Sequence, residues 1–154
     1  MPAPRSIEID ESLWPVLTIR YRGVTTTAQF AELLAARSRY LDRHERHLVI
    51  QDLTQSSSMT SSEQRRIQLE WLKKEGERMR QWVVGTAFVT DSAPLRLLLS
   101  VIHHLRPLPM PYMIFPRMSE ALPWVSARLR QSGLEIRGPS LHEHFGLEHG
   151  RSLG

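Results

Sequence analysis

The chain has 154 residues, 41% of them hydrophobic and 23% charged, which is typical of one folded domain with an ordinary core and excludes a disordered chain. It has no cysteine, which excludes a disulfide framework, a thiolate metal centre and a cysteine nucleophile. The net charge of +4 is spread along the chain, with positive residues interleaved with glutamates, so the sequence has no clustered basic stripe of the kind that binds nucleic acid.

Two strands and a helix are predicted at the start of the chain. Residues Ser6–Glu11 alternate weakly between apolar and polar side chains, and Val16–Arg22 alternates clearly before it ends at Gly23. This period of two is typical of a strand with one solvated side. The capping box Thr26-x-x-Gln29 follows, and apolar residues then recur at helical spacing over about Thr27–His44, which predicts the first helix.

The middle of the chain predicts two buried strands around a second helix. Leu48–Ile50 is a short apolar run, as expected of a strand that is buried on both faces. The polar residues of Gln55–Ser62 have the composition of a loop, and Thr60-x-x-Glu63 is a capping box that opens a helix ending near Trp82. The next buried strand is predicted over Trp82–Val89.

Two more helices and one strand complete the pattern. Asp91 or Ser92 as a cap and Pro94 in the first turn predict a helix over about Ala93–Leu105, and a proline-rich stretch stops it. Tyr112–Phe115 is the last predicted strand, and a final helix runs to about Gln131.

The elements therefore alternate in the order β-β-α-β-α-β-α-β-α. Strands joined through helices imply right-handed crossovers and parallel pairing, with the first strand antiparallel at an edge. We predict a single α/β domain over residues 6–132, with a mixed, mainly parallel sheet of about five strands and four helices. Residues 1–5 are expected to be a short N-terminal tail and residues 133–154 a loosely ordered C-terminal tail.

This pattern resembles the STAS domain, the fold of anti-sigma factor antagonists such as SpoIIAA and of the cytoplasmic parts of sulfate transporters, over about Ser6–Arg130. In that family a strand ending in Asp-Leu-Ser/Thr leads to an Asp-Ser-Ser-Gly turn at a helix start, where a partner kinase phosphorylates a serine. Here Leu48–Thr54 matches the strand, and Thr60-Ser61-Ser62-Glu63 stands at the turn, with threonine for aspartate and glutamate for glycine. Glu63–Arg66 and Gly85–Val89 are similar to a stand-alone bacterial group of SpoIIAA-like proteins.

The serine-rich loop is the first candidate site. The resemblance implies that Ser61 and Ser62 are phosphorylation candidates. A phosphate there would place about −1.5 to −2 charges at a helix N-terminus, with Arg65 and Arg66 one turn on. The alternative is that Thr60 only caps the helix and that the serines form a plain loop.

Helix 93–105 is the second candidate, because its apolar residues cover more than one face. Either neighbouring elements bury it unusually fully, or it exposes an apolar patch for a protein partner, a second copy or an apolar ligand. Its last turn carries His103 and His104, where protonated rings would favour the negative end of the helix dipole. The candidate interaction surface consists of Leu95, Leu98, Leu99, Val101, Ile102 and Leu105.

Catalytic and metal sites are not predicted, because the sequence contains no nucleophile elbow, phosphate loop, zinc-binding helix motif or dinucleotide fingerprint. Asp52 and Asp91 form a candidate polar site at the ends of two neighbouring strands, although aspartate also simply starts turns there. His142, His144 and His149 lie in a terminal segment with no second shell to orient them, so we expect no metal and no cofactor.

We therefore predict a non-enzymatic regulatory or scaffolding module that works through a protein partner, forms a homodimer and is open to control by serine phosphorylation. The alternative is a carrier of a small apolar or lipid-like ligand under helix 93–105. An enclosed pocket would favour the carrier, whereas a flat patch shared between two copies would favour the regulatory or scaffolding module. An enzyme using Asp52, Asp91 and the serine loop is a third hypothesis. Met1–Glu11 lacks the apolar core of a signal peptide, and no apolar stretch reaches the ~20 residues that span a bilayer, so we expect a cytoplasmic protein.

Overall fold

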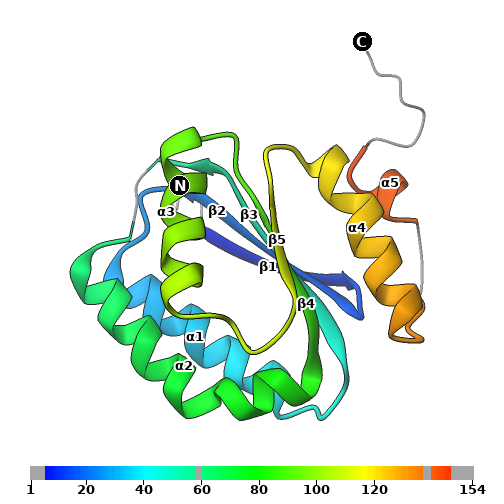
Figure 1. The fold of residues 1–154 in the computed structure, drawn as a ribbon, viewed down its shortest axis with the longest axis horizontal. Coiled ribbons are helices and arrows are strands. Elements are labelled where there is room, and N and C mark those ends of the chain that lie inside the picture. Colours follow the sequence, from blue (N-terminus) through cyan, green and yellow to red (C-terminus); the bar gives the residue numbers. More distant parts are fainter. Residues whose placement is uncertain (1–5, 58–59, 137–139, 147–154) are drawn as a thin grey trace, which may run out of the picture.

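The fold is one sheet with helices on both faces, as the computed structural model of residues 6–57, 60–136 and 140–146 shows (Figure 1). The strands are β1 (Ile7–Leu13), β2 (Val16–Gly23), β3 (His47–Ser56), β4 (Val83–Val89) and β5 (Tyr112–Phe115). They lie side by side in the order β1-β2-β3-β4-β5, with β1 antiparallel to β2 and every later pair parallel. The predicted mixed, mainly parallel sheet with an antiparallel edge strand is thus confirmed.

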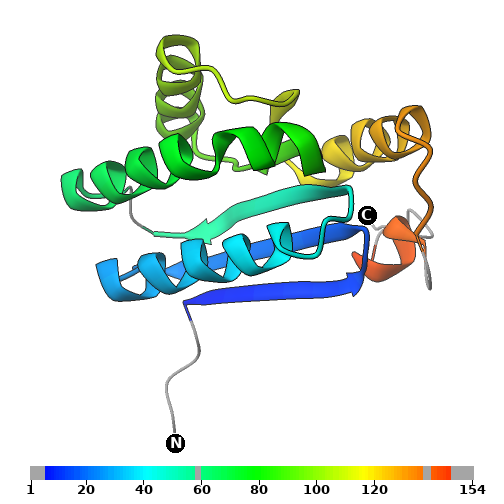
Figure 2. The same cartoon turned by 90° about the horizontal axis from the view of Figure 1, so that it is seen from below.

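The helices divide between the two faces for a topological reason. They are α1 (Thr27–Leu41), α2 (Ser62–Trp82), α3 (Ala93–Leu105), α4 (Met118–Gln131) and the short α5 (Leu141–His144). α1, α2 and α3 each join neighbouring parallel strands that advance in one direction across the sheet, and right-handed crossovers place such helices on a single face. α4 and α5 follow the last strand and cover the opposite face (Figures 1 and 2).

The core accordingly has two halves, because neighbouring residues of a strand point to opposite faces of the sheet. The half under α4 and α5 contains Leu13, Val16, Leu48, Ile50, Ala87, Val89, Leu122, Val125, Leu129 and Leu141. The half under α1 and α2 contains Ile19, Tyr21, Phe30, Leu33, Leu34, Val49, Trp71, Met79 and Val83. The apolar run Leu48–Ile50 contributes to both halves, as predicted for a central strand.

Two helix boundaries differ from the predictions. α1 ends at Leu41 rather than near His44, whose φ of 56° is left-handed and cannot continue a helix. α2 is capped by Ser61, whose Oγ accepts a hydrogen bond from the Gln64 amide, so the prediction that Thr60 is the cap was wrong by one residue. Both segments offer several residues that can end or cap a helix, and tertiary packing selects one of them.

A fifth helix joins the four predicted ones, in the segment that was expected to be a loose tail. Ser140 caps α5 through a reciprocal capping box with Glu143. Leu141 is buried in the core half under α4, and the His144 Nε2 atom lies 2.9 Å from Oδ2 of Asp10 in β1. Residues 140–146 are therefore tied both to the core and to the edge strand.

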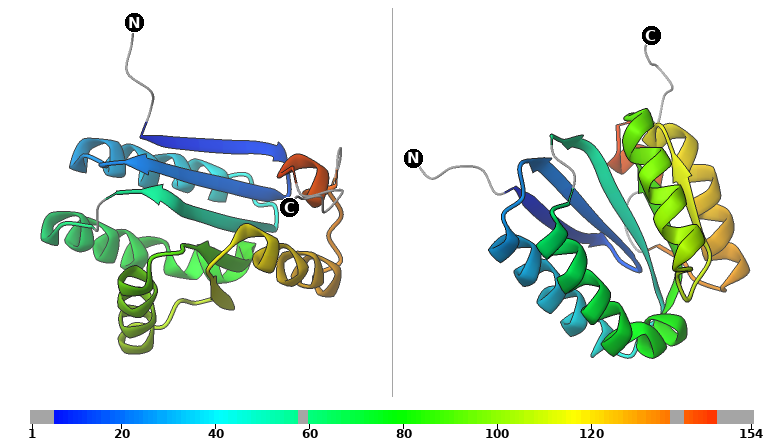
Figure 3. Two further views of the ribbon diagram at one scale, coloured as in Figure 1. Left: turned by 90° about the horizontal axis from the view of Figure 1, so that it is seen from above. Right: turned by 60° about the vertical axis from the view of Figure 1, so that its left-hand side comes forward.

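α3 is the least embedded of the long helices. His103 is its only buried residue among 13. The helix projects away from the layer formed by α1 and α2, as the views from below and from above show (Figure 2 and Figure 3, left). This placement opens the space between α2 and α3 in which the candidate site lies.

Candidate functional site

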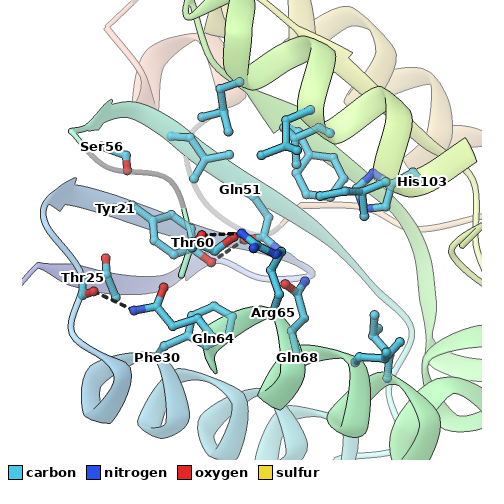
Figure 4. Close-up of a pocket in the computed structure, with 18 of the residues that line it drawn as sticks. Tyr21, Thr25, Phe30, Gln51, Ser56, Thr60, Gln64, Arg65, Gln68 and His103 are labelled. Atoms are coloured by element: carbon cyan, nitrogen blue, oxygen red, sulfur yellow. Dashed lines mark hydrogen bonds between the residues drawn. The ribbon is translucent and has the colours of Figure 1, made fainter. Parts of the chain in front are cut away.

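A pocket of about 240 Å³ lies between α2 and α3, over the carboxyl ends of β2, β3 and β4 (Figure 4). Open α/β sheets place their ligand sites at this end of the strands. Its floor is made by Tyr21 of β2, Gln51 and Leu53 of β3, and Phe88 of β4. Strand alternation turns Gln51 and Leu53 to the same face, and the sheet register pairs Gln51 with Phe88.

The walls of the pocket are mainly apolar. Phe30 of α1 and Leu69 and Leu72 of α2 form one side. α3 forms the other side with four residues at helical positions i, i+3, i+4 and i+7, which share one helix face. These four residues are Leu95, Leu98, Leu99 and Ile102.

The predicted interaction surface on α3 is therefore divided between two faces. Four of its six residues line the pocket. The other two, Val101 and Leu105, point outward together with Leu97; their exposed fractions are 47%, 72% and 67% respectively. We call Leu97, Val101 and Leu105 the outer row. The apolar excess of α3 is explained by one face that lines a pocket and a second face that is solvent-exposed.

Polar groups gather on one side of the pocket. The Tyr21 hydroxyl donates a 2.6 Å hydrogen bond to Oε1 of Gln51, and Gln64 Nε2 donates to the Thr25 carbonyl at 2.9 Å. Burial raises the pKa of Tyr21 to about 12, so its hydroxyl stays protonated and remains a donor. Gln68 also lines this side, and Figure 4 shows it beside Gln64 on α2.

Arg65 reaches across this polar side. Its Nη1 donates to the Thr60 carbonyl at 2.7 Å, and Figure 4 shows the guanidinium extending from α2 toward Tyr21 and Gln51. Arg106, just after α3, is the second arginine of the lining. The lining contains no aspartate or glutamate.

His103 lies on the α3 side of the pocket. Its ring packs between Phe88 and Tyr112, with centroid distances of 5.0 and 4.9 Å, and only 5% of the residue is exposed. Nδ1 of His103 has no hydrogen-bond partner among the described residues. Burial lowers the pKa of His103, so the ring is neutral at physiological pH, and the expectation of a protonated histidine at a helix end was wrong for this residue.

The two candidate serines lie at the start of α2, close to the pocket mouth. Ser61 is the N-cap and Ser62 the first helical residue, and both are exposed. Arg65 Nη2 lies 3.5 Å from the Ser62 Oγ, whereas Arg66 forms ion pairs with Glu63 and Glu70. Of the two arginines expected to face a phosphate, Arg65 is therefore the one in place.

The two candidate aspartates are not brought together in the pocket. Asp52 follows Gln51 on β3 and so points to the opposite face of the sheet, where its Oδ1 accepts hydrogen bonds from the Thr54 amide (3.0 Å) and hydroxyl (2.6 Å). Asp91 is exposed after β4. The Asp52 carboxylate thus bonds within its own strand, and its Oδ2 lies 3.5 Å from Nε of Arg20 in the neighbouring strand β2.

The described histidines of the C-terminal segment do not form a metal site. His144 pairs with Asp10, and His142 is exposed on α5, while His149 lies outside the described residues. Within residues 6–57, 60–136 and 140–146, no group of three histidine or carboxylate side chains could hold a metal ion. In the same ranges, no helix combines the length and apolar character needed to cross a bilayer.

Sequence reasoning missed the residues that give the pocket its polarity. These residues are Tyr21, Gln51 and His103. Each lies in or next to a segment whose pattern predicts only an ordinary core strand or the end of a helix. The available signal was Gln51, an uncharged polar residue directly after the apolar run of a central strand, where a polar side chain needs a partner.

No protein-family model and no curated protein sequence matches this chain. Its structure is similar to the crystal structure of an uncharacterized protein of the DUF3478 family with a SpoIIAA-like fold, from Shewanella loihica PV-4. The TM-score is 0.59 at 16% sequence identity, and the match covers 81% of this chain and 98% of that chain. The resemblance predicted from the order of elements is confirmed at the level of the fold: this chain has a SpoIIAA-like fold.

Proposed function

We propose that this chain is a non-enzymatic STAS-type module that binds a small apolar, lipid-like ligand in the pocket between α2 and α3. The observation that carries the proposal is the pocket itself: about 240 Å³, walled by aliphatic side chains from two helices and floored by the sheet. A space of this size admits water, which would lie there against apolar walls. Displacing such water is favourable for an apolar ligand.

His103 gives a second reason to expect a ligand. A buried polar atom without a partner costs free energy, and such atoms are rare in folded proteins unless they serve a function. Nδ1 of His103 is such an atom among the described residues, in a side chain that lines the pocket. Asp52 and Asp91, on which the enzyme hypothesis relied, lie outside the pocket, so binding without catalysis is the proposed activity.

The test is binding of the neutral dye N-phenyl-1-naphthylamine, whose emission rises in apolar surroundings. Leu98→Asn places an amide in the pocket wall, and Leu97→Asn makes the same change on the outer row of the same helix. Leu98 is half-buried, so the substitution should remove about half of the ~1.5–3 kcal/mol that burying a leucine side chain contributes. The affinity for the dye should therefore fall roughly fivefold. Leu97→Asn should leave the affinity unchanged. Equal affinities for the two variants, or no dye binding by the native chain, would refute the proposal.

A second candidate function, a regulatory or scaffolding module that forms a homodimer, is favoured by the outer row. Three large aliphatic side chains exposed along one helix are a typical protein contact surface. Light scattering of the native chain over a dilution series tests this function. A dimer that dissociates in Val101→Asp and Leu105→Asp variants would support it, and a monomer at every concentration would exclude self-association. Leu98 and Ile102 are unsuitable for this test because they line the pocket.

Phosphorylation of Ser61 or Ser62 stays a prediction. Both side chains are exposed at the N-terminus of a 21-residue helix, where the dipole favours a phosphate. Mass spectrometry of the chain isolated from its native cells would detect the modification. Ser57→Ala, a change in a nearby exposed serine, is the matched control for Ser62→Ala.

A further inference from the structure

We propose that the pocket takes an amphiphile with an anionic head group, received by Arg65 on the polar side, with its alkyl tail under α3. This inference rests on the proposed function and names the class of its ligand. The shared chemistry is a singly or doubly charged oxyanion on an aliphatic chain, which an alkyl carboxylate or an alkyl phosphate supplies.

The charges of the pocket lining have a single sign. Among the residues that the structure describes, Arg65 and Arg106 are the charged residues of the lining, and no carboxylate lines the pocket. Thr60 also lines the pocket, and it lies next to the N-terminus of α2, where the helix dipole adds a partial positive charge. An anionic head group would meet only attractive charges there, and a cationic one only repulsive charges.

Among the described residues, neither of the two lining arginines forms an ion pair of the kind that several other arginines of the chain form. In the part of the chain that the structure describes, no carboxylate lies within ion-pair distance of Arg65 or Arg106. Arg66, the neighbour of Arg65 on α2, pairs with both Glu63 and Glu70. Carboxylate partners are also present for Arg20, Arg22, Arg43, Arg78, Arg80 and Arg117.

A third positive charge is buried beside the floor of the pocket. Arg37 of α1 is 7% exposed, and its guanidinium lies 4.9 Å from the ring centroid of Trp71. It has no ion-pair partner among residues 6–57, 60–136 and 140–146, and its charge acts on the neighbouring Tyr21, where it opposes the rise in pKa caused by burial. A buried charge is weakly screened, so an anion near Tyr21 would be stabilised by it.

The geometry separates a head site from a tail site. The hydrogen bond from Arg65 Nη1 to the Thr60 carbonyl fixes the guanidinium at the polar side of the pocket, whose lining also includes Tyr21 and Gln51 (Figure 4). A guanidinium offers further N–H groups in a planar fork, which suits the two oxygens of a carboxylate or phosphate. The aliphatic face of α3 supplies the tail site, with Leu95, Leu98, Leu99 and Ile102.

The test compares four ligands that share a ten-carbon tail: decanoate, decyl phosphate, 1-decanol and decylamine. Each displaces N-phenyl-1-naphthylamine from the native chain, at concentrations below micelle formation. We expect the two anions to bind more tightly than decanol, and decylamine to bind most weakly. Arg65→Gln should weaken decanoate roughly tenfold while leaving decanol unchanged, because one charge-assisted contact is removed. Arg65→Lys, which keeps the charge, should restore part of the loss.

The matched control is Arg66→Gln, which removes an exposed arginine from the same turn of α2 without touching the pocket. It should not change the affinity for any of the four ligands. Tighter binding of decyl phosphate than of decanoate would identify a phosphate head, and the reverse order a carboxylate; both support the proposal. Equal affinities of decanol and decanoate, or an equal loss of both in Arg65→Gln, would overturn it while leaving the proposed function intact. If neither the dye nor any ten-carbon ligand binds, the proposed function itself fails.

Discussion

Replacing His103 by phenylalanine should stabilise the protein, although the residue is buried among aromatic rings. The imidazole packs between Phe88 and Tyr112, and its Nδ1 atom has no partner among the described residues. An unsatisfied buried polar atom costs about 1–3 kcal/mol, which His103→Phe recovers. The larger benzene ring causes some overpacking, but the adjoining pocket gives it room, so we expect a net gain of about 1 kcal/mol.

Thr86→Val is the matched control for this substitution. The Thr86 Oγ1 atom is the other buried side-chain atom without a partner in the described part of the chain, and Thr86 lies outside the pocket lining. Valine has the same shape without the hydroxyl, so a gain of about 1 kcal/mol is expected here too. Urea unfolding followed by circular dichroism measures both gains, which correspond to about 2–4 °C in Tm for a chain of this size. Binding of N-phenyl-1-naphthylamine should stay unchanged in Thr86→Val.

The pH dependence gives an independent check on His103. Burial holds its folded-state pKa below the ordinary value of 6.5, so on unfolding the ring takes up a proton at mildly acidic pH. The stability of the native chain is therefore fully present above pH 6.5 and falls as the pH drops toward the folded-state pKa. His103→Phe removes this loss of stability at acidic pH. His47, whose pKa burial also lowers, continues to contribute its own loss in the variant. A variant that is less stable than the native chain at pH 7.5, or that shows the same acid loss, would refute the reasoning.

Three further perturbations test the rest of the fold. Leu122→Ala in the fully buried part of α4 should cost about 2–5 kcal/mol in urea unfolding, and a loss below 1 kcal/mol would contradict the assigned core. Gly133→Ala should cost about 1–2 kcal/mol of stability, because the φ of Gly133 is +70° and alanine is strained there. A Cβ at this position would meet only open space, so the cost comes from the backbone alone. An unchanged Tm would contradict this backbone conformation. Glu75→Gln should make the free energy of unfolding depend less steeply on pH in the acidic range. The hydrogen bond from Arg78 lowers the Glu75 pKa below 4.5, so its stabilisation is present above that pH and lost below it, and an unchanged curve would argue against the pair.

The order of elements could be predicted because each one carries its own periodicity. Val16–Arg22 alternates with a period of two, and the helix after Thr26 has both a capping box and an apolar stripe. These signals are local, so they need no knowledge of the rest of the chain. α5 also carries a local signal, the capping box Ser140-x-x-Glu143, but the glycines and histidines around it are typical of a loose tail.

The pocket could not be predicted in the same way, because it depends on contacts between distant segments. Tyr21 and Gln51 are separated by 30 residues and meet only through the sheet. The apolar excess of α3 was visible, but its division between a pocket face and the outer row depends on the angle at which α3 leaves the sheet. Periodicity gives the faces of a helix and does not say which of them meets a neighbour.

One whole face of the sheet depends on the last part of the chain to cover it. A ribosome releases the N-terminus first, so β1 to β5 and α1 to α3 leave the exit tunnel before α4 and α5 do. Until then Val16, Leu48 and Ile50, which pack under α4 in the finished protein, have no helix above them. The nascent chain thus exposes an apolar strip of the sheet until α4 and α5 have been synthesised and released, and this half of the core forms only then.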